Sequence, residues 1–280
     1  MTNLTNSSKQ KQTKLELLEL LQEKERRIKE DPLKYAKSHA KQEEFFQSDK
    51  PIRVLFWGNR VGKTEGCAQE VARYVLGVHP SRKIVLPIEV WCACPSYDMQ
   101  KETTQKKLER YIPQKQIKHI TYVKSGVWGE LELQDGSRIN FKSYEQGREK
   151  FQGARCNLIH LDEEPPKDVY TECAMRLADV DGVGQGRLIL TMTPLKGYTE
   201  MMSYFLEQRV SKIRKEEITS LEDLKNEDFE IVRSDPEITI NGKYYIQATW
   251  DDNLHLSDET KQQLRATLKP YELEAREKGI

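Results

Sequence analysis

The sequence has no net charge, no long apolar run and no paired cysteines, and each absence narrows the class of protein. Its 45 Lys and Arg residues balance 45 Asp and Glu residues. The total charge therefore gives no sign of a nucleic-acid binder, although a local basic patch is compatible with that balance. No segment approaches the roughly 18 apolar residues of a membrane-spanning helix. The polar start MTNLTNSSKQKQTK also lacks the apolar centre of a signal peptide, so we expect no export.

The cysteines do not form a disulfide or metal-binding pattern. There are five, none belongs to a Cys-x-x-Cys pair, and the five histidines are scattered without ligand spacing. An odd, dispersed cysteine count is typical of a reducing cytosol, where thiols serve as small core residues. We therefore expect no structural zinc site.

Short apolar segments alternate with helical ones over the central part of the chain. Each is bounded by Gly, Pro or acidic residues, as expected of parallel strands covered on both faces. These strand candidates are PIRVLFW (51–57), EVWCACP (89–95), CNLIHLDE (156–163) and GRLILTMTP (186–194). Residues 119–145 instead predict a β-hairpin around Asp135-Gly136. The pattern predicts an α/β fold with a mainly parallel sheet and a short antiparallel insert.

The two ends of the chain have a different character. We expect disorder over residues 1–12, followed by an amphipathic helix over 13–30 that lies on the domain or on a partner. From about residue 212 the chain is strongly charged, with short strands and one or two closing helices. The predicted division is a tail and helix (1–34), a core (35–210) and a small appended subdomain (211–280).

The segment 56-FWGNRVGKTEG-66 is close to the phosphate-binding pattern G-x-x-x-x-G-K-[ST], but Trp57 stands where the first glycine is expected. A strand precedes it and a helix follows, so backbone N–H groups and a helix N-terminus can converge on phosphate. Lys63 would reach the β- and γ-phosphates, and the Thr64 hydroxyl would bind Mg²⁺. A chance Gly-Lys-Thr at a helix start is the alternative for this segment alone. The remaining predicted nucleotide-binding residues are Gly58, Asn59, Arg60, Val61 and Gly62.

A second candidate is 158-LIHLDEEPP-166, where an apolar strand ends in two adjacent carboxylates. In α/β folds, ligands bind at the edge of the sheet where the carboxyl ends of the strands lie. Adjacent strand residues point to opposite sides, so Asp162 would hold Mg²⁺ while Glu163 would orient and deprotonate the attacking water. Alternatively, the acidic residues only begin the next helix, where they favour its dipole.

A third segment, GRLILTMTP, ends in Thr193, which is suited to sensing the γ-phosphate and passing the change onward. A phosphate loop after the first core strand, an acidic strand end about 100 residues later and this threonine form a consistent set. Together they predict Mg²⁺-dependent ATP hydrolysis.

With these segments, the chain resembles the ATPase domain of a tailed-bacteriophage DNA-packaging terminase large subunit. The resemblance starts near residue 35 and rests on GNRVGKT, LIHLDEEPP, LTMTPLKG and ATWDDNLHLSDE. It implies a RecA-like core with an additional strand and a catalytic glutamate, followed by a lid subdomain. ATP and Mg²⁺ are the implied cofactors.

The resemblance also implies roles for single residues. Gln42 matches the upstream glutamine that reads the adenine edge, with a solvated helix glutamine as the alternative. Arg60 would contact the γ-phosphate or sense lid closure. Arg148 would act on a neighbouring subunit's site, with Arg155 as a rival, and Thr193 would be the coupling residue.

The implied partners are double-stranded DNA, a portal protein, a small terminase subunit and further copies of the chain in a ring on the procapsid. The implied location is the cytoplasm of an infected bacterium. Full-length members continue into a ribonuclease-H-like nuclease domain, whose carboxylate cluster we do not find here, so we expect an ATPase fragment or a partner of a separate nuclease. The alternatives are a helicase or other RecA-like ATPase, and a non-catalytic nucleotide-binding module.

Overall fold

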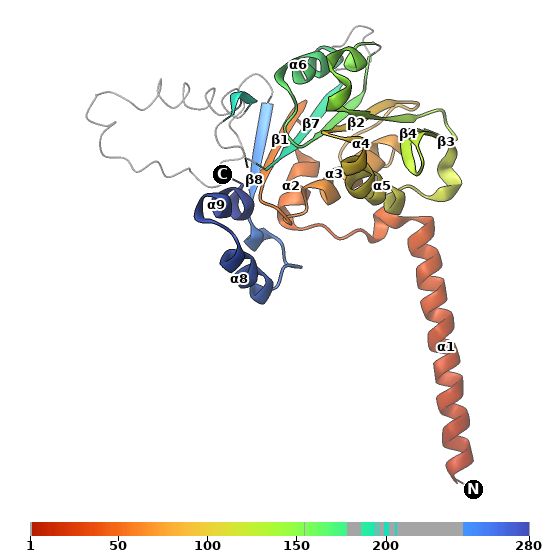
Figure 1. Cartoon of the computed structure of the whole chain (residues 1–280). Helices are drawn as coiled ribbons and strands as arrows, with labels where there is room; N and C mark the ends of the chain where they lie inside the picture. Colours follow the sequence, from red (N-terminus) through yellow and green to blue (C-terminus); the bar gives the residue numbers. More distant parts are fainter. Residues whose placement is uncertain are drawn as a thin grey trace.

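A computed structural model describes residues 2–153, 155–177, 186–193, 195, 199–201, 205 and 243–279. Within these ranges eight strands form one sheet (Figure 1). They are β1 (Ile52–Trp57), β2 (Glu89–Cys94), β3 (Ile117–Lys124), β4 (Val127–Leu133), β5 (Arg138–Ser143), β6 (Leu158–Asp162), β7 (Arg187–Met192) and β8 (Lys243–Ala248).

The strand order across the sheet is β3-β4-β5-β2-β6-β7-β1-β8. The neighbours from β5 to β8 are all parallel, whereas β4 runs antiparallel to both β3 and β5. The predicted parallel sheet with an antiparallel insert is therefore confirmed. Parallel strands align their carboxyl ends at one edge, so the ends of β1, β6 and β7 lie together.

Helices cover both faces of this sheet (Figure 1). The described α-helices are α1 (Thr2–Glu30), α2 (Ala40–Gln47), α3 (Lys63–Val75), α4 (Tyr97–Gln100), α5 (Lys106–Tyr111), α6 (Lys167–Met175), α8 (Asp258–Thr267) and α9 (Pro270–Lys278). A π-helical turn, Lys101–Gln105, joins α4 to α5. Short 3-10 turns occur at Tyr144–Gln146, Arg148–Phe151 and Trp250–Asp252. Among the described helices, none has the length and apolar character needed to span a membrane.

Alternation along β1 builds a core on each face. Leu55 and Trp57 belong to a buried cluster with α2, α3 and α5, while Val54 and Phe56 belong to a second cluster with α6. Successive strand side chains point to opposite faces, so a continuous apolar strand serves both layers. A fully buried side chain of this size contributes about 1.5–3 kcal/mol to folding.

Helix α1 departs from the sequence prediction at its start. It begins at Thr2, so residues expected to be disordered are helical; they include no Gly or Pro that would end a helix. The helix extends away from the sheet (Figure 1), so the first of its two predicted locations, on the domain or on a partner, is not observed. Leu17 and Leu21 are 56% and 48% exposed, which shows that this apolar face is not packed on the domain.

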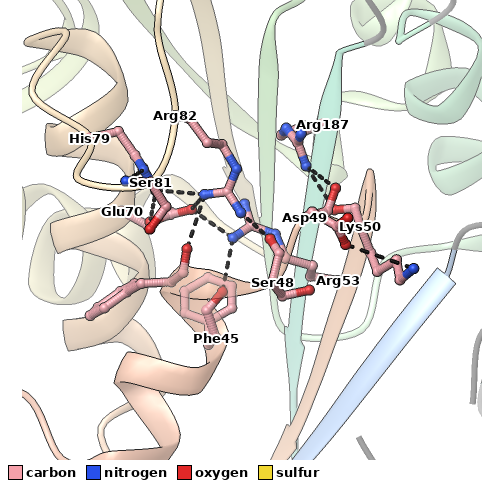
Figure 2. Close-up of polar contacts among 11 residues, drawn as sticks. Phe45, Ser48, Asp49, Lys50, Arg53, Glu70, His79, Ser81, Arg82 and Arg187 are labelled. Carbon is pink, nitrogen blue, oxygen red and sulfur yellow. Dashed lines mark hydrogen bonds and ion pairs between the residues drawn. The ribbon is translucent and has the colours of Figure 1, made fainter. Parts of the chain in front are cut away.

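A buried charged cluster joins α3 to β1 at the edge of the sheet opposite the carboxyl ends (Figure 2). Arg53 and Glu70 are fully buried, and Arg53 Nη1 donates to Glu70 Oε1 at 2.6 Å. His79 Nε2 lies 3.1 Å from the other Glu70 oxygen, and Arg82 Nη1 lies 3.4 Å from the first. Arg53 also donates to the Phe45 carbonyl at the end of α2. The cluster therefore fixes α2 and α3 relative to the first strand.

The predicted boundary near residue 210 lies outside the described residues. Beyond it, β8 pairs in parallel with β1, from Ile52↔Lys243 to Trp57↔Ala248. The segment after β8 then reaches the loop at the end of β1.

Candidate nucleotide-binding site

The loop between β1 and α3 turns through two left-handed residues. Gly62, at φ 99°, is the N-cap of α3, and Arg60 has φ 63°. Glycine enters this region freely, whereas a non-glycine residue there is strained. Because α3 begins at Lys63, this side chain and Thr64 stand in the first turn of the helix.

Trp57 is part of the core. Its side chain is fully buried, and its ring centroid lies 5.4 Å from that of His39. The position that requires glycine is the next one, because a Cβ on Gly58 would lie 2.4 Å from the Arg276 carbonyl oxygen. The shifted glycine in the motif therefore matches a close backbone approach at Gly58, made by α9.

The Lys63 ammonium lies inside the loop and uses all three of its hydrogens. Its Nζ donates to the carbonyls of Trp57 at 2.8 Å and Gly58 at 3.2 Å, and to Thr193 Oγ1 at 2.5 Å. Burial lowers the pKa of Lys63, and the nearby Glu163 and Asp162 oppose that shift. A phosphate entering the loop would replace some of these acceptors with charged oxygens.

Asp162, the last residue of β6, is buried, and both of its carboxylate oxygens accept hydrogen bonds. Thr191 Oγ1 donates to Oδ1 at 2.7 Å, and Thr104 Oγ1 to Oδ2 at 3.2 Å. Thr191 is placed by the register of β6 and β7, which pairs it with Asp162. Thr104 comes from the π-helical turn, and such turns are frequent at functional sites. These hydroxyls hold the carboxylate in one orientation.

Glu163 follows immediately and has φ 63°, so it also occupies the left-handed region. Its Oε2 accepts a hydrogen bond from the Thr193 backbone N–H at 3.3 Å. The Thr193 hydroxyl in turn donates to Asn59 Oδ1 at 2.9 Å and accepts from Lys63. One threonine therefore contacts the phosphate loop through its side chain and the adjacent glutamate through its backbone.

Gln42 lies against the loop from α2 and is buried. Its Nε2 donates to the Gly62 carbonyl at 3.0 Å, and its Oε1 accepts from the His39 N–H at 3.0 Å. A Cβ on Gly62 or Gly66 would meet its amide at 3.0 or 3.3 Å. An amide has two hydrogens and two lone pairs, so one of each remains for a further hydrogen bond.

The three arginines singled out from the sequence occupy separate places. Arg60 is exposed at the tip of the loop, and its carbonyl accepts from Asn253 Nδ2 at 2.6 Å. Arg148 is exposed at the start of a 3-10 turn, directly after Gly147 at φ 76°. Arg155 is half-buried near the start of β6. Only Arg60 belongs to the phosphate loop, as its position in the motif requires.

The closing segment, which comprises the residues that follow β8 (249–279), contacts the outer side of this loop. Trp250 Nε1 donates to the Asn59 carbonyl at 2.7 Å, and the Asn59 N–H donates to the Arg276 carbonyl at 2.7 Å. The Gly58 N–H is bonded to the Ala248 carbonyl at 3.2 Å. The loop is thus fixed on one side by the end of β8 and on the other by the last turn of α9.

Two oxygen-bearing side chains of the candidate site have the chemistry that a hard divalent cation prefers. Asp162 offers a carboxylate and Thr64 a hydroxyl, and Mg²⁺ prefers oxygen ligands, taking the remainder from water and substrate phosphates. Structure and sequence agree in placing Lys63, Asp162, Glu163 and Thr193 at one edge of the sheet.

Sequence reasoning missed Thr104 and Thr191, which orient Asp162. The repeat 191-TMT-193 was a usable signal, because residues two apart on a strand face the same side. Thr104 gives no such signal, since it lies in the polar helical run KETTQKK.

Comparison with known proteins identifies counterparts of this arrangement. The model of the family described as "Terminase large subunit, T4likevirus-type, N-terminal" matches residues 54–280. The large terminase subunit of Salmonella phage P22 is 29% identical over 319 positions, covering 99% of this chain and 56% of that protein. The chain therefore spans about half the length of this curated relative.

Solved structures agree on the fold. The large terminase of a thermophilic bacteriophage superposes with a TM-score of 0.62 at 15% identity, covering 88% of this chain and 54% of that one. The same phage protein has also been solved with ADP and with ATP-γ-S. The large terminase ATPase domain of Thermus phage P74-26 gives a TM-score of 0.57 at 15% identity and covers 88% of this chain and 94% of that one. The predicted RecA-like fold is confirmed, and because the family model matches most of the sequence, the chain belongs to the terminase large subunit family as its N-terminal region.

Proposed function

We propose that this chain is the ATP-hydrolysing motor region of a phage terminase large subunit, which drives double-stranded DNA into a procapsid. Membership of the terminase family supports this function over that of a helicase. The observation that carries it is the contact set of Thr193, which joins Lys63 to Glu163. A phosphate-binding cation and a carboxylate base linked by one residue suit phosphoryl transfer to water.

In the proposed reaction, Lys63 exchanges loop carbonyls for β- and γ-phosphate oxygens. Glu163 accepts a proton from water as the water oxygen bonds to the γ-phosphorus, and the bond from that phosphorus to the ADP oxygen breaks. Thr193 would then sense the departure of phosphate, because its hydroxyl contacts Lys63 and its N–H contacts Glu163.

A bound Mg²⁺ would neutralise charge on the phosphates. Asp162 and Thr64 are the residues proposed to hold it, and the Thr104 and Thr191 hydroxyls would keep the Asp162 carboxylate oriented for this role. The thermophilic phage terminase has been solved with ADP and with ATP-γ-S, which supports nucleotide binding by this chain.

Further roles complete the proposal. The remaining donor and acceptor of Gln42 would read adenine, and exposed Arg60 would contact the γ-phosphate or sense the closing segment bonded to its carbonyl. Arg148, exposed on a short turn, would reach a neighbouring subunit's site, with Arg155 as its rival. The proposed partners are double-stranded DNA, a portal protein, a small terminase subunit and a ring of copies in the host cytoplasm.

The test compares two adjacent carboxylates. We expect Glu163→Gln to lower the ATP turnover number by about 10²–10⁴-fold, because a positioned general base contributes that factor. Glu164→Gln removes the same charge one residue later and should retain turnover within about threefold. Steady-state phosphate release by the purified chain, with Mg²⁺ present, measures both.

Equal activity of wild type and Glu163→Gln would show that the base is misassigned. Absence of any Mg²⁺-dependent ATP turnover in the wild-type chain, with and without double-stranded DNA, would contradict the motor function itself.

A further inference from the structure

Tyr144, which follows β5, links Asp162 and Glu163 to the segment after that strand. Its side chain is buried, and its hydroxyl lies 3.0 Å from the Glu163 carbonyl, 3.2 Å from the Asp162 carbonyl and 3.3 Å from the Ala93 carbonyl. A phenol has one hydrogen to donate. It therefore points into a group of three acceptors at the carboxyl ends of β2 and β6.

The acceptor nearest to Tyr144 belongs to a strained residue. Glu163 has φ 63°, a conformation that a non-glycine residue keeps only when its surroundings enforce it. Thr193 holds the Glu163 side chain, but the backbone carbonyls on both sides of the Glu163 N–H face Tyr144. The phenol is thus a support for the peptide that determines where the Glu163 carboxylate points.

Tyr144 also begins the segment that carries Arg148. Three contacts hold the ends of this segment: Ser143 Oγ donates to the Pro95 carbonyl at 2.8 Å, Tyr97 OH to Gln146 Oε1 at 3.0 Å, and Lys142 Nζ to the Lys150 carbonyl at 2.7 Å. Between them, Arg148 is exposed. A displacement of the Glu163 backbone would therefore act, through Tyr144, on a segment whose ends are fixed and on which Arg148 is exposed.

We propose that Tyr144 is a positioning residue for ATP hydrolysis, whose hydroxyl holds the Asp162–Glu163 backbone and joins it to the Arg148 segment. The inference rests on the proposed ATPase function.

The matched pair of variants is Tyr144→Phe and Tyr97→Phe. Both remove one hydroxyl bound to the same segment, but only Tyr144 reaches the carbonyls of Asp162 and Glu163. Phenylalanine keeps the ring beside Phe151, whose centroid lies 6.4 Å away, so Tyr144→Phe should remain folded.

We expect Tyr144→Phe to lower the ATP turnover number by about fivefold to tenfold, the factor of one lost hydrogen bond. Its dissociation constant for ATP-γ-S should stay within about twofold of wild type, because no phosphate-loop contact changes. Tyr97→Phe should retain both values. Turnover is measured by phosphate release and binding by calorimetry, with thermal unfolding of each variant as the measure of folding.

Three outcomes overturn the inference: unchanged turnover in Tyr144→Phe, an equal loss in both variants, or a loss that only follows weaker ATP-γ-S binding or unfolding. Glu163→Gln is assayed beside them. If Glu163→Gln abolishes turnover while Tyr144→Phe does not change it, only the positioning role fails; if wild type shows no turnover, the proposed function fails.

Discussion

Thr193 contacts the phosphate loop and the adjacent glutamate at the same time. Its hydroxyl accepts from Lys63 and donates to Asn59 Oδ1, while its N–H donates to Glu163. Two chain segments more than a hundred residues apart meet at this side chain, since Lys63 and Thr193 are separated by 130 positions. Loss of the hydroxyl is therefore expected to affect both the loop and Glu163, the proposed base.

We predict that Thr193→Val lowers the free energy of unfolding by about 1–2 kcal/mol, because Asn59 and Lys63 each lose a buried partner. ATP turnover should fall by about tenfold as Lys63 relaxes toward the loop carbonyls. Urea unfolding and phosphate release measure the two effects. Thr193→Ser keeps the hydroxyl and should restore most turnover; a serine variant as slow as valine would contradict the role of the hydroxyl.

The convergence of Lys63, Asp162, Glu163 and Thr193 could be predicted, because each ends or follows an apolar strand and parallel strands share one edge. Their chemical roles stay predictions. Tyr144 and Thr104 could not be predicted, since a tyrosine after a hairpin and a threonine in a polar helix have no distinctive spacing. Thr104 reaches Asp162 across 58 positions, through a π-helical turn that no residue pattern indicates.

Helix α3 is held at both ends by different chemistry. Its first residue, Lys63, lies at the phosphate loop, and its carboxyl-terminal half carries Glu70 within the buried charged cluster (Figure 2). Burial alone would raise the pKa of Glu70. The Arg53 guanidinium and His79 outweigh it and lower the pKa from the ordinary 4.5 to about 2. The cluster therefore favours the folded state only while Glu70 is ionised.

We predict that stability falls as pH drops from about 5 to 2. The pKa of Glu70 is lower in the folded state than in the unfolded state. Its contribution to the free energy of unfolding, about 3 kcal/mol, is therefore complete above pH 4.5 and is lost as the pH approaches 2. Glu70→Gln should cost about 3–5 kcal/mol at pH 7, because it leaves Arg53 buried without its counter-charge. Urea unfolding between pH 7 and pH 3 tests both, and a variant with the same acid sensitivity as wild type would exclude Glu70 as its source.

In the described residues, the carboxyl-terminal elements β8 and α9 contact β1 and the phosphate loop that follows it. β8 extends the sheet beside β1, and the end of α9 returns to the residues that follow β1. A Cβ on Gly279 would lie 2.3 Å from the Phe56 carbonyl oxygen, and one on Gly58 would meet the carbonyls of Arg276 and Glu277. Both glycines allow backbone to pack directly on backbone.

We predict that Gly58→Ala destabilises the chain by about 1–3 kcal/mol, the usual cost of overpacking, because α9 must move away from the loop. Gly66→Ala is the matched control. A Cβ there would meet the Gln42 side chain at 3.3 Å or more, and that side chain can shift. Chemical denaturation of both variants measures the difference; equal effects would mean that α9 adapts without cost.

The layer arrangement and strand directions follow from the sequence, but the strand order does not. Unbroken apolar segments such as 158-LIHLD-162 indicate parallel strands buried on both faces. Nothing within β8 shows that it pairs with β1, because pairing between strands almost 200 residues apart depends on the whole fold. The exposure of α1 could not be predicted either, because an apolar helix face does not indicate which surface it packs against.

The edge of the sheet at β3 affects how copies of this protein can meet. The register with β4 shifts at three places along β3, and β3 carries Lys118 and Lys124, whose side chains are about half exposed and paired with Glu132 and Asp98. Such irregular, charged edges resist the addition of a further strand. We therefore expect that copies of this protein do not continue the sheet through this edge, which guards against fibre-like aggregation.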